Sequence, residues 1–149
     1  MMKAKSGFTL VEILIVVVIL GILAAIVIPQ FTEASTEAKT SSLCTDLQTV
    51  RSQIELYKVQ HNDLLPGETA SVTFVQALTQ KTDIAGALSA TGAYGPYLQK
   101  IPTNQFNDLS TVRLDGADAG ANTAGWRFGT TGTTEGFFQA DDTAAHAAY

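Results

Sequence analysis

The hydrophobic pattern of the chain begins with one unbroken apolar run. Residues 8–28 are 21 positions in which Glu12 is the only ionisable side chain. As a helix, such a run would be roughly 30 Å long, which matches the hydrocarbon core of a bilayer. Lys3 and Lys5 precede the run without an acid, so the N-terminus is expected to stay cytoplasmic. The pattern predicts a membrane-spanning helix over residues 8–29.

Two apolar stripes follow in a predicted amphipathic continuation of this helix over residues 30–61. One stripe recurs at spacings of three and four and is expected to be covered by an outer domain. The other is offset by more than a quarter turn, and its small alanines would let a neighbouring helix approach closely. It can equally be a solvated face with incidental alanines. The first stripe contains Leu43, Leu47, Val50, Ile54, Tyr57 and His61, and the second contains Phe31, Ala34 and Ala38.

Gly21 and Pro29 bracket a weak segment of this helix. Proline has no N–H group, so Pro29 cannot bond to the carbonyl of Ala25, and glycine lowers helix stability. The pattern predicts local weakness between Gly21 and Pro29, in the simplest case a kink at the membrane exit.

The remaining residues, 62–149, predict one small outer domain. A helix is expected from about Val72 to Gln80 with Thr69 or Ser71 as its cap, and residues 111–114 alternate as a strand. Segments 125–128 and 135–139 flank a Gly/Thr turn and predict a β-hairpin.

The resulting fold class is α+β. A long N-terminal helix would be packed by a small C-terminal domain with a short helix and an antiparallel β-sheet. Trp126 and Phe128 are expected to close over the first stripe, and residues 141–149 predict a flexible tail.

The composition argues against nucleic-acid binding, catalysis and metal binding. The formal charge is −5, and it would be −7 if the segment that carries Lys3 and Lys5 were removed from the chain. Acids then outnumber bases, and no basic patch remains that could bind nucleic acid. Cys44 is the only cysteine, which excludes an intrachain disulfide. His61 is expected to cap the helix end, and His146 shows no partner pattern. The sequence predicts no enzyme, no cofactor and no metal-binding His/Cys spacing.

The N-terminal string Lys5-Ser6-Gly7, then Phe8-Thr9-Leu10-Val11-Glu12 and the apolar run resembles the start of type IV prepilins and pseudopilins. The resemblance implies a leader peptide of residues 1–7, cleavage by a prepilin peptidase between Gly7 and Phe8, and N-methylation of Phe8. A secretory signal peptide fits less well because the run is too long. A plain signal anchor leaves Glu12 unexplained.

Glu12 is the first candidate for a functional residue. Cleavage would give Phe8 a terminal ammonium group, four residues before Glu12. If the helix included Phe8, this spacing would place the ammonium group on the same helix face as Glu12. The resemblance implies that Glu12 pairs with the terminal amine of a neighbouring subunit, which would set the register of assembly. The alternative is an acid that reaches the membrane interface.

A second string, Gly95-Pro96-Tyr97-Leu98 followed by Ile101-Pro102, resembles the major pseudopilins of type II secretion systems. Its packing role would be to tuck Tyr97, Leu98 and Ile101 under the domain. After Pro102 the likeness weakens, because an expected second proline is missing and only the aromatic residue is retained.

The resemblance implies a structural subunit of a pilus-like filament, most simply a type II secretion pseudopilin. Its partners would be copies of itself, the prepilin peptidase, an inner-membrane assembly platform and minor pilins or pseudopilins. The precursor would be a single-pass inner-membrane protein, and the filament would extend into the periplasm or to the cell surface. Two alternatives stay open: a major type IV pilin for adhesion or motility, and a membrane-anchored binding module.

Calcium is a further implication of the resemblance, because some secretion pseudopilins stabilise the C-terminal region with this ion. Oxygen ligands are available, yet the acids lack the alternating pattern of a calcium loop, so solvated acidic loops are favoured. The six acids after Thr103 are Asp108, Asp115, Asp118, Glu135, Asp141 and Asp142.

Overall fold

A computed structural model describes residues 7–69, 71–116 and 120–149, so the expected leader before Gly7 and the acid Asp118 lie outside the described residues. The chain divides into two compact units, residues 1–38 and residues 39–149, which share one long helix. The elements are α1 (Leu10–Gln60), α2 (Phe74–Thr79), β1 (Val112–Leu114), β2 (Trp126–Phe128), η1 (Gly132–Thr134), β3 (Phe138–Ala140) and η2 (His146–Ala148).

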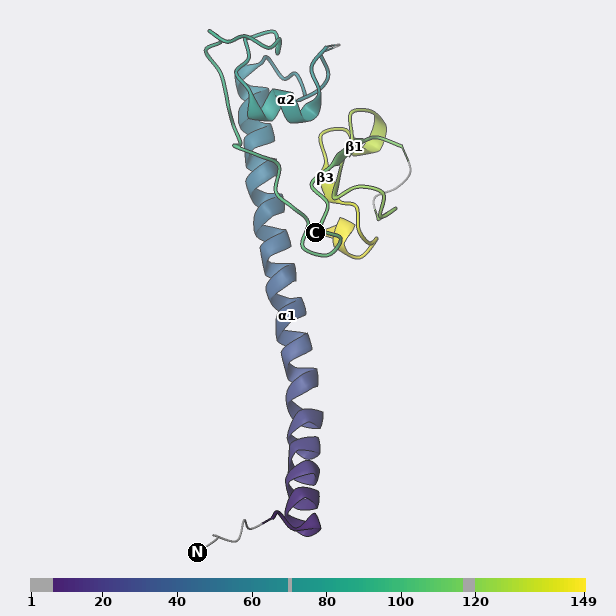
Figure 1. Ribbon diagram of the computed structural model, residues 1–149. Helices are drawn as coiled ribbons and strands as arrows, with labels where there is room; N and C mark the ends of the chain where they lie inside the picture. The colour runs from purple at the N-terminus through teal and green to yellow at the C-terminus, as the bar shows by residue number, and fades with distance from the viewer. Residues whose placement is uncertain (1–6, 70, 117–119) are drawn as a thin grey trace, which may run out of the picture. The chain divides into compact units, whose positions relative to one another are not determined.

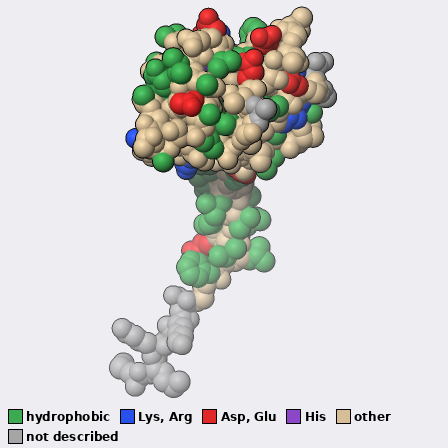
Figure 2. Space-filling model, turned by 90° about the horizontal axis from the view of Figure 1, so that it is seen from above, with side chains coloured by type: hydrophobic (Ala, Val, Ile, Leu, Met, Phe, Trp, Pro, Cys, Tyr) green, Lys and Arg blue, Asp and Glu red, His purple; other side chains and the backbone are tan. Residues whose placement is uncertain are grey.

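The first unit consists of the N-terminal part of α1. Every described residue of this unit is exposed in the monomer, although most of its side chains up to Ile28 are large and apolar. Figure 2 shows such apolar side chains along the surface of the helical segment. Among the described residues, α1 is the one helix that is long and apolar enough to cross a membrane, with a mean hydropathy of 3.3 in its most apolar window.

The second unit is built around the C-terminal half of α1. The first apolar stripe is buried from Leu43 to Tyr57, as its three-and-four spacing predicts. Trp126 and Phe128 from β2 and Phe138 from β3 belong to the same hydrophobic cluster, which confirms the expected closure of the hairpin over the stripe. In Figure 1, α2 lies beside the C-terminal end of α1.

Helix α2 begins later than predicted because its cap is Thr73. The Thr73 hydroxyl accepts a hydrogen bond from the Gln76 N–H, and the Gln76 side chain accepts one from the Thr73 N–H. Such a reciprocal cap needs a Glu or Gln three residues after the capping residue. The predicted caps Thr69 and Ser71 have Val72 and Phe74 at that position, so neither can form it.

The sheet is mixed and not antiparallel throughout. Strands β2 and β3 pair antiparallel, which confirms the predicted hairpin, but β1 pairs with β2 in parallel, with Val112 opposite Trp126. A parallel neighbour needs a connection that returns to the start of the first strand. Residues 115–125 make this return, and the N–H groups of Gly125 and Trp126 then donate to the carbonyl of Thr111.

The C-terminal tail, predicted to be flexible, is packed against the domain. Asp141 and Ala147 are buried, and the tail ends in a short 3-10 helix. Arg51 of α1 donates from Nε to the carbonyl of Phe138 at 2.9 Å and from Nη1 to the carbonyl of Tyr149 at 2.7 Å. Arg51 thereby ties the C-terminal half of α1 to β3 and to the tail.

His61 lies in the core and does not merely cap the helix end. Its ring stacks on Tyr57 with centroids 3.9 Å apart, and both ring nitrogens have partners, the carbonyl of Tyr57 at 2.8 Å and the hydroxyl of Thr82 at 2.9 Å. The segment around Tyr97 covers this region, since the Tyr97 hydroxyl donates to the Gln60 side chain at 2.6 Å.

Replacing Leu47, which is 1% exposed, with alanine should destabilise the second unit by about 3 kcal/mol, because the cavity cannot be filled from a packed core. Urea denaturation of the full chain in detergent, followed by the fluorescence of Trp126, the single tryptophan, measures this change. Leu56, on the same helix and 43% exposed, is the matched control: Leu56→Ala should change stability by less than about 0.5 kcal/mol. Equal effects of the two substitutions would contradict this core.

Candidate functional site

Glu12 and Thr9 form a reciprocal cap at the start of α1. The Glu12 Oε2 atom accepts hydrogen bonds from the Thr9 N–H at 2.9 Å and from the Thr9 hydroxyl at 2.8 Å. The Thr9 oxygen in turn accepts the Glu12 N–H at 3.3 Å. The helix therefore starts at Leu10, and two N–H groups that a helix terminus leaves unpaired are satisfied by side chains.

This cap changes the expected geometry around Phe8. Phe8 precedes the helix, so the helical spacing that would place its amine on the same face as Glu12 does not apply. The Thr-x-x-Glu pattern of residues 9–12 was the available sequence signal for the cap. All contacts of the Glu12 carboxylate use Oε2, and Oε1 has no hydrogen-bond partner among the described residues.

Gly7 and Phe8, the expected processing residues, are both exposed and lie outside regular structure. Phe8 is 84% exposed. Both residues precede the first helical turn, so neither is held in the hydrogen bonding of α1.

No described residue of its unit covers the second apolar stripe. Phe31, Ala34 and Ala38 are all exposed, and Phe31 is 76% exposed. Their spacing of three and four places them on one face of α1. The geometry therefore leaves this face open, in contrast to the buried stripe that begins at Leu43.

Gly21 and Pro29 lie inside a helix that the structure draws without interruption. Near the proline, the Thr32 hydroxyl donates to the carbonyls of Ile28 and Pro29, each at 2.9 Å. These bonds do not replace the missing one, because the carbonyl that lacks the Pro29 N–H is that of Ala25. The expected weakness therefore stays a prediction about helix stability, because no break is present.

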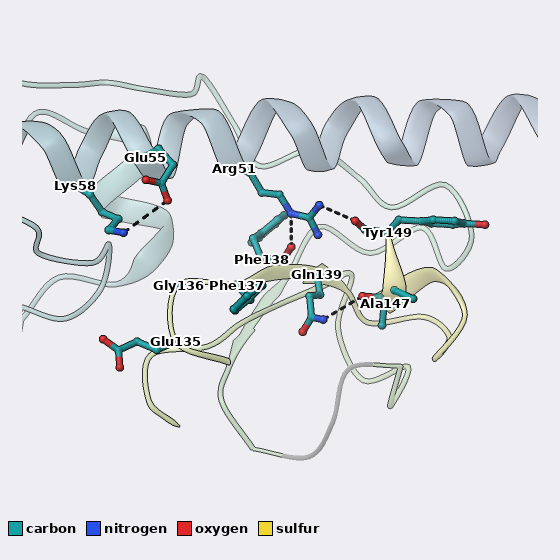
Figure 3. A pocket seen from close by; sticks show the side chains of 11 residues that line it. Arg51, Glu55, Lys58, Glu135, Gly136, Phe137, Phe138, Gln139, Ala147 and Tyr149 are labelled. Atoms are coloured by element: carbon teal, nitrogen blue, oxygen red, sulfur yellow. Dashed lines mark hydrogen bonds and ion pairs between the residues drawn. The ribbon is translucent and has the colours of Figure 1, made fainter. Parts of the chain in front are cut away.

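A pocket lies between α1, β3 and the C-terminal residues (Figure 3). Arg51 extends from α1 toward the tail, and the Gln139 side chain donates to the carbonyl of Ala147 at 3.0 Å. Lys58 and Glu55 form an ion pair at 3.7 Å on the same helix. The residues that line this pocket include no Ser, Cys or His.

Asp141 is the centre of the polar interactions in the C-terminal region. Arg113 of β1 binds its carboxylate through two nitrogens, at 2.6 Å to Oδ1 and 3.2 Å to Oδ2. Burial by itself would raise the pKa of Asp141, but hydrogen bonds from Arg113 and from the Ala124 N–H outweigh burial and lower the pKa to about 2. The buried carboxylate is therefore held in its charged form.

Comparison with known proteins identifies the family of this chain. Residues 2–28 match the prokaryotic N-terminal methylation motif. The type II secretion system core protein G of Vibrio cholerae is 30% identical over 133 residues, which cover 82% of this chain and 89% of that protein. This chain belongs to the type II secretion system core protein G family.

Other relatives extend the comparison. The core protein G of Pseudomonas aeruginosa is 29% identical over 141 residues, covering 80% of this chain and 91% of that protein. A fimbrial protein of Pseudomonas aeruginosa is 27% identical over 121 residues, covering 80% of this chain and 74% of that protein. No solved structure matches the chain. Membership of this pseudopilin family makes the chain a structural protein and not an enzyme.

The calcium ion that the resemblance implies does not fit the described acids of this pseudopilin. Among residues 7–69, 71–116 and 120–149 there is no group of three or more His, Cys, Asp or Glu side chains that could hold a metal ion. Asp141 is bound by Arg113, and Asp142 accepts a hydrogen bond from the Asn104 side chain at 2.8 Å. Hydrogen bonds from Thr130 and Thr131 lower the pKa of Asp115.

The low pKa of Asp141 predicts a specific loss of stability in acid. A carboxyl whose pKa is lower in the folded state stabilises that state above its ordinary pKa, here 3.8, and the contribution disappears as the pH falls toward 2. The expected loss is about 2 kcal/mol between roughly pH 4 and pH 2. Equilibrium unfolding of the full chain at a series of pH values measures it.

Substitution of Asp141 with asparagine should flatten this pH dependence, because the titrating group is gone, and should lower stability at neutral pH. Asp108 is exposed and serves as the matched control, so Asp108→Asn should keep the slope of the native chain. A slope unchanged by Asp141→Asn would show that other groups cause the acid sensitivity.

Proposed function

We propose that this chain is the polymerising subunit of a type II secretion pseudopilus. In this proposal the precursor is inserted in the inner membrane, cleaved after Gly7, methylated on Phe8, and packed helix to helix into a filament that acts in protein secretion. The observation that carries the proposal is the first unit: an apolar helical segment with no buried residue in the monomer.

The exposed apolar surface of this segment needs a non-aqueous partner. Fully burying a Val, Leu or Ile side chain is worth roughly 1.5–3 kcal/mol, and the segment exposes many such residues. A membrane supplies that environment to the precursor, and a bundle of identical helices would supply it to the assembled subunit. The same residues would thus serve both locations.

Glu12 would give the bundle its register. Its Oε2 atom is used by the cap with Thr9, and its Oε1 atom remains available to accept a hydrogen bond from the terminal amine of a neighbouring subunit. A carboxylate buried among apolar helices is strongly unfavourable unless it is paired. Subunits docked one step out of register would leave that charge unpaired, and such contacts would be rejected.

The face formed by Phe31, Ala34 and Ala38 would contact a neighbouring helix above the membrane level. Small side chains permit close approach of two backbones, and Phe31 would supply apolar contact area. The helix between Gly21 and Pro29 would be able to change its conformation during packing. Glycine lowers helix stability through its conformational freedom, and proline removes one helical hydrogen bond.

The partners in this proposal are copies of the same chain, the prepilin peptidase, the inner-membrane assembly platform and minor pseudopilins. The precursor would lie in the inner membrane and the filament in the periplasm. The similarity to a fimbrial protein supports a second candidate, a surface pilus. A deletion strain separates the two, since loss of protein secretion indicates a pseudopilus and loss of surface fibres indicates a pilus.

Replacing Glu12 with alanine should abolish filament assembly while cleavage of the precursor continues. The reason is that cleavage needs the accessible segment around Gly7, whereas assembly needs the charge at Glu12. Filaments are counted by electron microscopy of sheared cells that overexpress the protein, and cleavage is followed by the shift in mass on removal of residues 1–7. Protein secretion is scored in the same strains.

Two variants complete this experiment. Glu33→Ala removes an exposed acid of the same unit and should leave assembly intact. Gly7→Leu should remain uncleaved and thereby identifies the precursor band. Normal filaments from Glu12→Ala would refute the proposed role of Glu12, and loss of filaments from Glu33→Ala as well would show a nonspecific charge effect.

A larger side chain on the open face should also impair assembly. Ala34→Leu should reduce the number and length of filaments, because two helices could no longer approach closely, while insertion and cleavage stay normal. Thr36 is two residues on, roughly 200° around the helix, and Thr36→Leu is the matched control. Equal filament yields from both variants would exclude this face from the interface.

A further inference from the structure

The carboxylate of Asp141 is surrounded by protein donors. Asp141 is 0% exposed and follows β3, where the tail begins. Seven hydrogen bonds end on its two oxygens at 2.6–3.3 Å. The donors are Nε and Nη2 of Arg113, the N–H groups of Gly120, Ala121, Thr123 and Ala124, and the hydroxyl of Thr123.

Arg113 supplies the positive charge at this position. Its side chain is 19% exposed, and its Nη2 atom lies 2.6 Å from Asp141 Oδ1. A further nitrogen of the same guanidinium, Nη1, donates to the carbonyl of Asp115 at 2.6 Å. One side chain from β1 thereby joins the beginning of the return loop to the beginning of the tail.

The return loop also meets the tail directly. Gly120 has a φ of +94°, and a Cβ atom added to it would lie 2.4 Å from the main-chain nitrogen of Ala144. The loop backbone is therefore packed closely enough on the tail that only glycine fits. The N–H groups of Gly120 and Ala121 in this loop donate to Asp141 Oδ1, so their positive ends face the carboxylate.

A calcium ion would compete poorly for these acids. Calcium takes six to eight oxygen ligands, and each N–H group directed at Asp141 repels a cation. Asp142 is engaged by Asn104 and by His146, and Asp115 accepts hydrogen bonds from the N–H groups of Thr130 and Thr131. Three of the described acids, Asp115, Asp141 and Asp142, are thus already bound by groups of the chain.

We propose that Arg113 acts as the internal cation of the C-terminal region, so that this pseudopilin folds without calcium. The guanidinium neutralises Asp141 and fixes the return loop and the tail, a role for which other secretion pseudopilins use the ion. This inference concerns the second unit and does not rest on the proposed filament function.

The test is thermal unfolding of the full-length precursor in detergent, followed by Trp126 fluorescence, in 2 parallel buffers that contain calcium chloride or the chelator EGTA. The native chain should melt at the same temperature in both, within about 1 °C. Arg113→Met, which keeps an unbranched apolar side chain and removes the charge, should melt roughly 10 °C lower in both buffers, because Asp141 then stays buried without its ion-pair partner. Lys100→Met removes an exposed cation and should melt like the native chain.

Two results would overturn the inference. The first is a lower melting temperature of the native chain in EGTA, which would reveal a calcium site completed outside the described residues. The second is an unchanged melting temperature for Arg113→Met. If Arg113→Met does not fold, the melting temperatures of the native chain in the two buffers still decide whether folding depends on calcium. A second variant, Arg113→Lys, keeps the charge but loses the two-nitrogen contact, so its melting temperature should lie between those of the native chain and Arg113→Met.

Discussion

The exposed apolar surface of α1 is the constraint on which the rest of this chain depends. From Gly7 to Ala38 no described residue is buried, so the first unit has no stable state in water as a monomer. A lipid bilayer satisfies this surface without any specific contact, and a bundle of helices satisfies it only where the helices match. Lipid does not select the register of a helix. The choice of neighbouring helix and register would therefore come from the few positions in the first unit that do not carry a large aliphatic side chain. In the proposed filament, Glu12, Phe31, Ala34 and Ala38 would be such positions.

The same helix changes its role where the second unit begins. From Leu43 onward one stripe of α1 is covered by the hydrophobic cluster that contains Trp126 and Phe138. The opposite face keeps exposed residues, including Leu56 and Val59. A helix that is stabilised by tertiary packing along one half can hold a fixed shape there, while the other half relies on its surroundings.

The sequence predicted the parts of this structure that depend on local periodicity, and it failed where distant residues decide. The buried stripe on α1 and the hairpin of β2 and β3 follow from spacing and turn residues alone. The caps at Thr9 and Thr73 were readable in principle, since each has a Glu or Gln three residues later. The parallel pairing of β1, by contrast, depends on how residues 115–125 return, and no local pattern encodes that path. The same holds for the burial of Asp141, whose partner Arg113 lies 28 positions away.

With a single cysteine, the second unit must fix its tail without a disulfide, and two arginines do so in different ways. Arg51 reaches from the helix to the main-chain carbonyl of Phe138, a neutral acceptor. Arg113 instead meets a carboxylate, so its contribution depends on the charge of Asp141. The contact of Arg51 with Phe138 does not titrate, whereas the ion pair of Arg113 is lost when Asp141 is protonated. Acid should therefore loosen the return loop and the start of the tail while the hydrogen bond between Arg51 and Phe138 persists.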